Sequence, residues 1–153
     1  MVTAVTSTGR IALRLTRRFA APRERVFDAW TTPEALKRWW CPPGWRSERI
    51  EVDLRAGGAY YFGMRQPDSD SVVSIQGRFL EVLRPDRLVY TWCWHGAFDG
   101  MQDTRVTVEF HSVDGGTDVV VVHENFPDVK LWQRHRGGWI AACDRMEQIL
   151  EET

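Results

Sequence analysis

Residues 128–152, DVKLWQRHRGGWIAACDRMEQILEE, hold the pattern that decides the fold. Their large apolar side chains recur mainly at steps of three, four and seven, which place them in one stripe along an α-helix. The stripe consists of Trp132, Trp139, Cys143, Met146, Ile149 and Leu150. The other side is charged and contains Arg134, Asp144, Arg145, Glu147, Glu151 and Glu152, which suit a solvated face. We therefore predict a long amphipathic helix laid across a broad apolar surface.

The pair Gly137-Gly138 interrupts this pattern. A glycine inside a helix costs roughly 1 kcal/mol relative to alanine, so we expect the regular helix to begin near Gly138, after a looser turn from Asp128. The alternative is that the missing side chains let a backbone segment or a ligand come close to the helix. The sequence leaves both interpretations open.

The chain before this helix is dominated by alternating apolar and polar residues, which is typical of half-buried strands. We expect strands over 10–20, 50–55, 59–65, 72–83, 87–94, 106–110 and 117–125, with two short helices after Pro22 and Thr31. Residues 1–9 are small and polar, so they are expected to form a flexible N-terminus, with one domain over 10–153. This order predicts an α+β domain in which an antiparallel sheet curves around the final helix.

One face of three successive strands is apolar throughout. It consists of Leu88, Tyr90, Trp92, Val106, Val108, Phe110, Val119 and Val121. Because a slip of one residue would expose this whole set, we predict that it faces the final helix.

The composition limits which partners and which cellular compartment we expect for the protein. A net charge of −1 and a pI of about 6.4 give no general attraction to nucleic acid or to anionic membranes. No apolar run is long enough for a membrane span or a signal peptide. Cys41, Cys93 and Cys143 are few, widely spaced and odd in number, so free thiols in a reducing cytoplasm are expected. The preference for arginine over lysine favours a bacterial source.

Motifs of catalysis and cofactor binding are absent: there is no P-loop, dinucleotide fingerprint, zinc-protease motif or nucleophile elbow. The histidines lie on different elements without ligand spacing, so neither a metal nor a cofactor is expected. His123 shares a strand face with Val119 and Val121. Three roles are open for it: a general base for a cyclase- or hydrolase-like reaction, a contact that orients a polar group of a ligand, and a structural histidine that is hydrogen-bonded to a neighbour or half in water.

Eight tryptophans are the most unusual feature of the composition. An indole offers a large apolar area with one N–H group, which suits either an aromatic ligand or a filled core. The candidate cavity residues are Phe79, Tyr90, Trp92, Trp94, His123, Trp132, Trp139 and Trp39. The expected entrance lies near Trp39, Trp40, Trp45 and the loop 95–103.

Several motifs in one order resemble the heat-shock-protein-90 ATPase-activator homologues, a branch of the START-like, birch-pollen-allergen-like SRPBCC superfamily. The matching stretches are RRFAAPRERVFDAWTTPEALKRWWCPPGW (17–45), EVDLRAGGAYYF (51–62), GRFLEVLRPDRLVYTWCW (77–94), TRVTVEF (104–110), GTDVVVVHENF (116–126) and HRGGWIAACDRMEQIL (135–150). The resemblance implies a helix-grip fold: a seven-stranded antiparallel sheet wraps the C-terminal helix, with two short helices between strands 1 and 2 and a ligand cavity inside. It also implies a connection to stress response.

Members of that superfamily include co-chaperone domains, antibiotic self-resistance proteins, lipid or hormone carriers and polyketide cyclases, so the fold alone does not define the function. We expect a monomer or homodimer that binds a small hydrophobic or aromatic molecule. The alternatives are a co-chaperone-like module that contacts a chaperone or another protein, and an enzyme that uses His123. The eukaryotic co-chaperone has an additional N-terminal domain for which 153 residues leave no room, which argues against chaperone activation.

Overall fold

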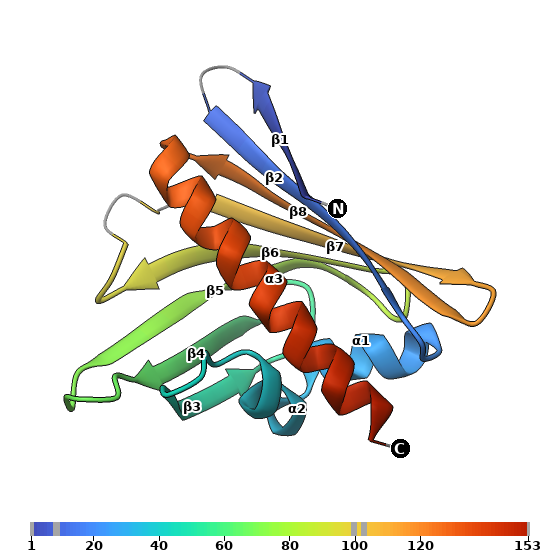
Figure 1. The fold of residues 1–153 in the computed structure, drawn as a ribbon, viewed down its shortest axis with the longest axis horizontal. Coiled ribbons are helices and arrows are strands. Elements are labelled where there is room, and N and C mark those ends of the chain that lie inside the picture. Colours follow the sequence, from blue (N-terminus) through green and yellow to red (C-terminus); the bar gives the residue numbers. More distant parts are fainter. Residues whose placement is uncertain (1, 8–9, 99–100, 102–103, 153) are drawn as a thin grey trace.

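The computed structural model describes residues 2–7, 10–98, 101 and 104–152, and it contains three helices and a sheet (Figure 1). In chain order the elements are β1 (Val2–Ser7), β2 (Arg10–Phe19), α1 (Arg23–Thr31), α2 (Pro33–Trp39), β3 (Arg46–Val52), β4 (Ala59–Arg65), β5 (Val72–Leu83), β6 (Arg87–His95), β7 (Thr104–Val113), β8 (Gly116–Phe126) and α3 (Val129–Glu151). This is the predicted α+β helix-grip architecture.

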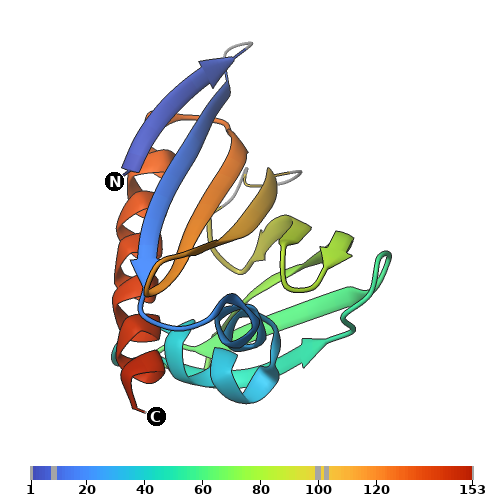
Figure 2. The same cartoon turned by 90° about the vertical axis from the view of Figure 1, so that its right-hand side faces the viewer.

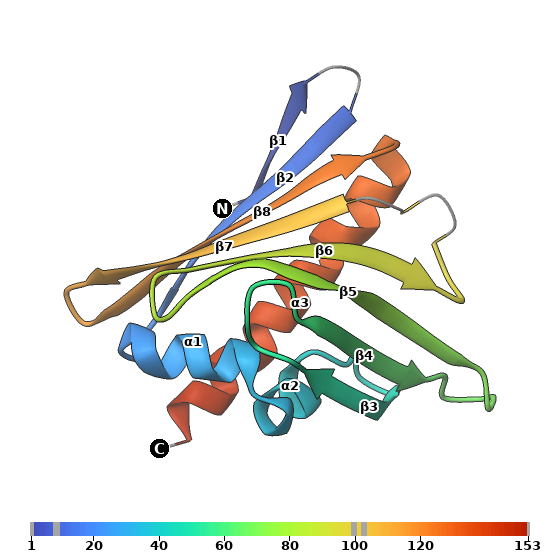
Figure 3. The same cartoon turned by 180° about the vertical axis from the view of Figure 1, so that it is seen from behind.

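The sheet is antiparallel throughout, in the order β1-β2-β8-β7-β6-β5-β4-β3. After β2 the chain passes through α1 and α2 to the far edge and then returns strand by strand until β8 pairs with β2. Helix α3 crosses one face of the sheet, and the two short helices lie near its C-terminal end (Figures 2 and 3). This arrangement leaves α3 beside β2 and β8 on one side and beside α2 on the other.

The sheet has eight strands rather than the seven expected from the resemblance. The additional strand is β1, in the segment for which we predicted a flexible terminus, and it pairs with β2 from Val2 opposite Leu15 to Ser7 opposite Arg10. Its sequence VTAVTS is rich in β-branched residues, which favour strands. Pairing also satisfies the backbone groups along the edge of β2.

The predicted burial of the apolar sheet face is confirmed. The face is covered by α1 as well as by α3, since Phe110 packs against Phe27 of α1 and Trp92 packs against Trp139 of α3. All eight of its side chains, from Leu88 on β6 to Val121 on β8, are at most 5% exposed. The register places Val108 opposite Leu88 on one side and opposite Val121 on the other, so the face is continuous across β6, β7 and β8. Helix α3 adds Trp139, Cys143, Met146 and Leu150 to the same core.

Helix α3 begins at Val129, nine residues before the predicted start at Gly138. The side chain of Asp128 accepts a hydrogen bond of 2.8 Å from the backbone N–H of Leu131, which stabilises the first turn. The helix then continues through both glycines, because the buried side chains of His135 and Trp139 on either side offset their low helix propensity.

Gly77 marks a close approach of β5 and β6. A Cβ atom at this position would lie 2.3 Å from the backbone oxygen of Thr91, so only glycine fits. The register shift between these strands lies slightly further along, between Phe79 and Glu81. Gly77 therefore lies in an irregular strand, and the bulge of that strand follows Phe79.

Candidate ligand cavity

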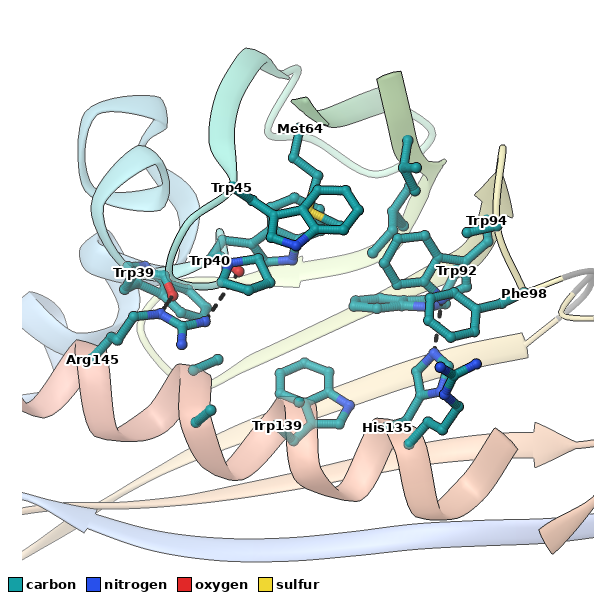
Figure 4. Close-up of a pocket in the computed structure, with 18 of the residues that line it drawn as sticks. Trp39, Trp40, Trp45, Met64, Trp92, Trp94, Phe98, His135, Trp139 and Arg145 are labelled. Carbon is teal, nitrogen blue, oxygen red and sulfur yellow. Dashed lines mark hydrogen bonds between the residues drawn. The ribbon is translucent and has the colours of Figure 1, made fainter. Parts of the chain in front are cut away.

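A cavity of about 440 Å³ lies between α3, the C-terminal end of α2 with the loop after it, and strands β4, β5 and β6 (Figure 4). Its wall is formed by Trp39, Trp40, Pro42, Pro43, Trp45, Met64, Val73, Ile75, Trp92, Trp94, Ala97, Phe98, Arg134, His135, Gly138, Trp139, Ala141, Ala142 and Arg145. Six of the eight tryptophans of the chain are therefore wall residues.

Three of the six indole N–H groups of the wall donate to protein acceptors. Trp39 donates to the backbone oxygen of Ala29 over 2.8 Å, and Trp94 and Trp139 donate to histidines. The Nε1 of Trp92 is buried and, among the described residues, has no hydrogen-bond partner. The cavity consequently meets mainly hydrocarbon and aromatic surface.

The eight candidate cavity residues separate into three groups. Trp39, Trp92, Trp94 and Trp139 lie on the cavity wall. Phe79 and Tyr90 border a smaller void deeper in the core. His123 and Trp132 are on the wall of neither, and Trp132 donates its indole N–H to the backbone oxygen of Ala12 on β2 over 3.3 Å.

The expected entrance is described only in part. Trp40 and Trp45 are on the wall, as are Ala97 and Phe98 from the loop 95–103. Residues 99–100 and 102–103 of that loop lie outside the described residues.

His123 is completely buried and both of its ring nitrogens are engaged. Nδ1 accepts a hydrogen bond of 3.2 Å from the indole N–H of Trp139, so the proton of the neutral ring is on Nε2, which lies 3.2 Å from Oγ1 of Thr104. The Thr104 hydroxyl in turn donates to the backbone oxygen of Trp92 over 2.6 Å. Burial, with a further contribution from His135, holds the pKa of His123 well below its usual value. A neutral, sealed histidine of this kind has no free lone pair for a general base.

His135 is a wall residue that the sequence analysis did not select. Its Nε2 accepts a hydrogen bond of 2.8 Å from the indole N–H of Trp94, and its Nδ1 lies 2.8 Å from the backbone oxygen of Leu131. Burial lowers its pKa from 6.5 to about 4, against the opposing effect of the bond to Leu131 and with a small contribution from Arg134. The ring is therefore neutral at physiological pH.

Arg145 was assigned to the solvated face of the helix, which is wrong. Its Nε donates to the backbone oxygen of Trp39 over 2.7 Å and its Nη2 donates to that of Trp40 over 3.3 Å, at the C-terminal end of α2. Asp144 and Glu147 from the same predicted face bind Arg17 on β2, at 2.7 and 3.0 Å. Helix α3 thus has protein on more sides than a single apolar stripe indicates.

Small residues open the helix surface toward the cavity. Gly138 and Ala141 are wall residues one helical turn apart, with Ala142 beside them. A Cβ atom on Gly138 would meet nothing within 4 Å. The alternative interpretation of the glycine pair, an opening beside the helix, therefore agrees with the geometry at Gly138, whereas Gly137 is not on the wall.

Two classes of site are not found in the described part of the chain. No group of three or more His, Cys, Asp and Glu side chains there converges as metal ligands would. None of the described helices combines the length and the apolar character needed to cross a membrane.

Residues 20–151 match the family described as activator of Hsp90 ATPase homolog 1-like protein. The chain belongs to this family. A crystal structure of a Chromobacterium violaceum protein is similar over 93% of this chain and 98% of that one, at 30% identity and a TM-score of 0.84. A Nitrosomonas europaea protein is 26% identical, with a TM-score of 0.78, over 96% of this chain and 97% of that one.

The crystal structure of a Silicibacter pomeroyi protein named AHSA1 has the same fold, with a TM-score of 0.78 at 23% identity over 92% of this chain and 97% of that one. No curated protein matches the sequence significantly. The family and the fold are therefore shown, and the ligand has to be inferred from the cavity itself.

Proposed function

We propose that the protein binds a small, predominantly apolar ligand with an aromatic portion in the cavity between α3 and the sheet. The observation that carries this proposal is the cavity of about 440 Å³ with six tryptophans in its wall. Ligand sites typically have about 300–1,000 Å³ and a mostly apolar lining with a few polar groups, and this cavity meets both criteria. Members of this fold class commonly bind hydrophobic ligands, which adds independent support.

A protein-interaction function of the co-chaperone kind is the second candidate. The description of the family favours it, as do Leu80 and Leu83 on β5, which are each 51% exposed. Docking through a surface has no need of an internal cavity, however, so this function leaves the main feature of the structure without a role. An enzyme based on His123 has less support, because that ring is sealed in the core.

The test is a titration with N-phenylnaphthylamine, a neutral aromatic probe whose fluorescence rises in apolar surroundings. We expect saturable binding of one probe per chain, a higher melting temperature because the ligand binds only the folded state, and partial quenching of tryptophan fluorescence. Quenching should be partial, since Trp30 and Trp132 are not on the cavity wall. Absence of saturable binding would overturn the proposal.

A surface variant controls for binding outside the cavity. Leu83→Ser removes an exposed apolar side chain far from the wall residues in sequence and on the outer side of β5. We expect its affinity for the probe to equal that of the wild type. A marked loss of affinity in this variant would instead indicate surface binding and favour the interaction function.

A further inference from the structure

The charges on the cavity wall are of one sign. Among the described residues of the wall, the ionisable side chains are Arg134, His135 and Arg145, and none is an Asp or Glu. His135 is neutral at physiological pH because its pKa is about 4. The described part of the wall therefore presents two positive charges, at separate positions along α3, and no carboxylate to balance them.

Arg145 is half-buried and only partly satisfied. A guanidinium has five N–H groups, and the structure gives two of those on Arg145 a protein acceptor, the backbone oxygens of Trp39 and Trp40. Within the described residues no carboxylate forms an ion pair with it, since the adjacent Asp144 binds Arg17 instead. Burial lowers the pKa of Arg145, and it outweighs the opposing attraction of Cys41, Asp144 and Cys143, so the cation is only partly compensated for the water it has lost.

The hydrogen bonds to α2 explain why this cation is held in place. The last carbonyl groups of a helix carry partial negative charge and attract a cation, so Arg145 caps α2. That role fixes the position of the guanidinium and uses its Nε edge, while Nη1 has no acceptor in the described part of the chain. A fixed cation with free donors at an apolar cavity is a suitable partner for an oxyanion.

Arg134 differs in its surroundings. Its side chain is exposed, and its Cζ atom lies 5.2 Å from the centre of the Phe98 ring, in a cation–π arrangement. Water and the ring can both stabilise that charge, so Arg134 has less need of an anion than Arg145. The two arginines thus form a natural pair for comparison.

We propose that the ligand is an amphipathic anion: an aromatic or alicyclic body fills the cavity, and a carboxylate or similar oxyanion binds Arg145. This inference rests on the proposed function and specifies the class of ligand. The body is recognised by the tryptophan wall, and the anion by the guanidinium N–H groups that the protein leaves free.

The test compares naphthoate with naphthamide as competitors of N-phenylnaphthylamine. The two competitors have the same ring system and nearly the same shape, and only naphthoate is charged. We expect naphthoate to displace the probe at a concentration about tenfold lower than naphthamide, because a hydrogen bond to a charged group is markedly stronger than a neutral one. Equal potency, or a preference for the amide, would overturn the inference and leave the proposed function standing; failure of the probe itself to bind would overturn the proposed function.

Variants locate the effect. The preference is measured in each variant as the ratio of the naphthamide and naphthoate concentrations that displace the probe. Arg145→Gln should lose this preference, Arg145→Lys should recover part of it, and Arg134→Gln should keep most of it. An unchanged preference in Arg145→Gln would show that Arg145 does not bind the anion. If loss of the α2 contacts unfolds Arg145→Gln, the test is the salt dependence of the wild-type protein. Its preference for naphthoate over naphthamide should shrink as salt rises from about 0.05 to about 0.5 M. A preference that does not change with salt would contradict the ionic contact.

Discussion

The indole N–H of Trp94 on β6 donates a hydrogen bond to Nε2 of His135 on α3 across 2.8 Å. The acceptor nitrogen must keep its lone pair for this bond, so the structure selects the neutral form of a buried imidazole. Protonation would break the bond and place a cation beside Arg134, which already contributes to the low pKa of His135.

The protein should therefore lose stability in mild acid. The pKa of His135 is about 4 in the folded protein and 6.5 in its ordinary state, so the unfolded chain binds more protons between these values. Stability from this group is fully present above pH 6.5 and is lost as the pH falls toward about 4, by roughly 3 kcal/mol in total. His123, whose pKa is also lowered, acts in the same direction.

Urea unfolding at a series of pH values measures this effect. His135→Gln should show a shallower loss of stability between about pH 6.5 and pH 4 than the wild type. His111, which is exposed on β7, provides the control, and His111→Gln should retain the full acid-induced loss. Identical slopes for His135→Gln and the wild type would show that this ring is not the group responsible.

Filling the space beside Gly138 should block the cavity without harming the fold. Gly138→Leu places a side chain where a Cβ atom meets nothing within 4 Å, and the change from glycine raises helix propensity. We expect affinity for N-phenylnaphthylamine to fall by at least about tenfold while stability rises by up to about 1 kcal/mol.

Gly137→Leu is the matched control for this substitution. Gly137 is equally open and equally helical, but it is not on the cavity wall. The control should gain the same stability and keep its affinity for the probe. Equal loss of binding in both variants would mean that the probe does not occupy this cavity.

Met146→Ala should destabilise the protein by roughly 2–5 kcal/mol, because Met146 is fully buried and its truncation leaves a cavity in the core. Gln148→Ala, on the exposed side of the same helix, should change stability by less than about 0.5 kcal/mol. Chemical denaturation of the two variants provides the comparison, and similar losses would contradict the assignment of the buried face of α3.

Thiol reactivity should distinguish the three cysteines. All three are free, and burial raises the pKa of the Cys143 thiol to about 12, whereas Cys41 and Cys93 are partly accessible. A thiol reagent should count three groups in denaturant without reductant and should react with Cys143 slowest in the native protein. A count of one in denaturant would reveal a disulfide, and rapid native labelling of Cys143 would contradict its burial.

The alternation of apolar and polar residues was sufficient to predict the core of the sheet, because successive side chains on a strand point to opposite faces of the sheet. Leu88, Val106 and Val121 all face the interior for this reason. The predicted start of α3 at Gly138 was wrong because the low helix propensity of glycine is outweighed by tertiary packing around Trp139. That packing cannot be seen in a single sequence. β1 was not predicted because its small and polar residues were taken as the sign of a flexible terminus, although several of them are β-branched.

The cavity wall on α3 was less accessible to sequence reasoning. A single apolar stripe describes a helix that contacts one surface. Helix α3 also contacts the end of α2, where Arg145 is half-buried, and it buries His135 against Trp94 of β6. Arg145 was predicted to be solvated for this reason. The signal that could have marked it is the run of small residues Gly138, Ala141 and Ala142, which lie on the same side of the helix.

The two hydrogen bonds between indole and imidazole run in opposite directions across the same interface. Trp139 of α3 donates to His123 of β8, and Trp94 of β6 donates to His135 of α3, one helical turn from Trp139. Sliding α3 by one turn would bring two indole donors, or two imidazoles, face to face, at a cost of about 1–3 kcal/mol for each buried group left without a partner. These two bonds therefore favour a single register of α3 on the sheet. That register sets the spacing between the helix and the indoles of β6 that a ligand has to match.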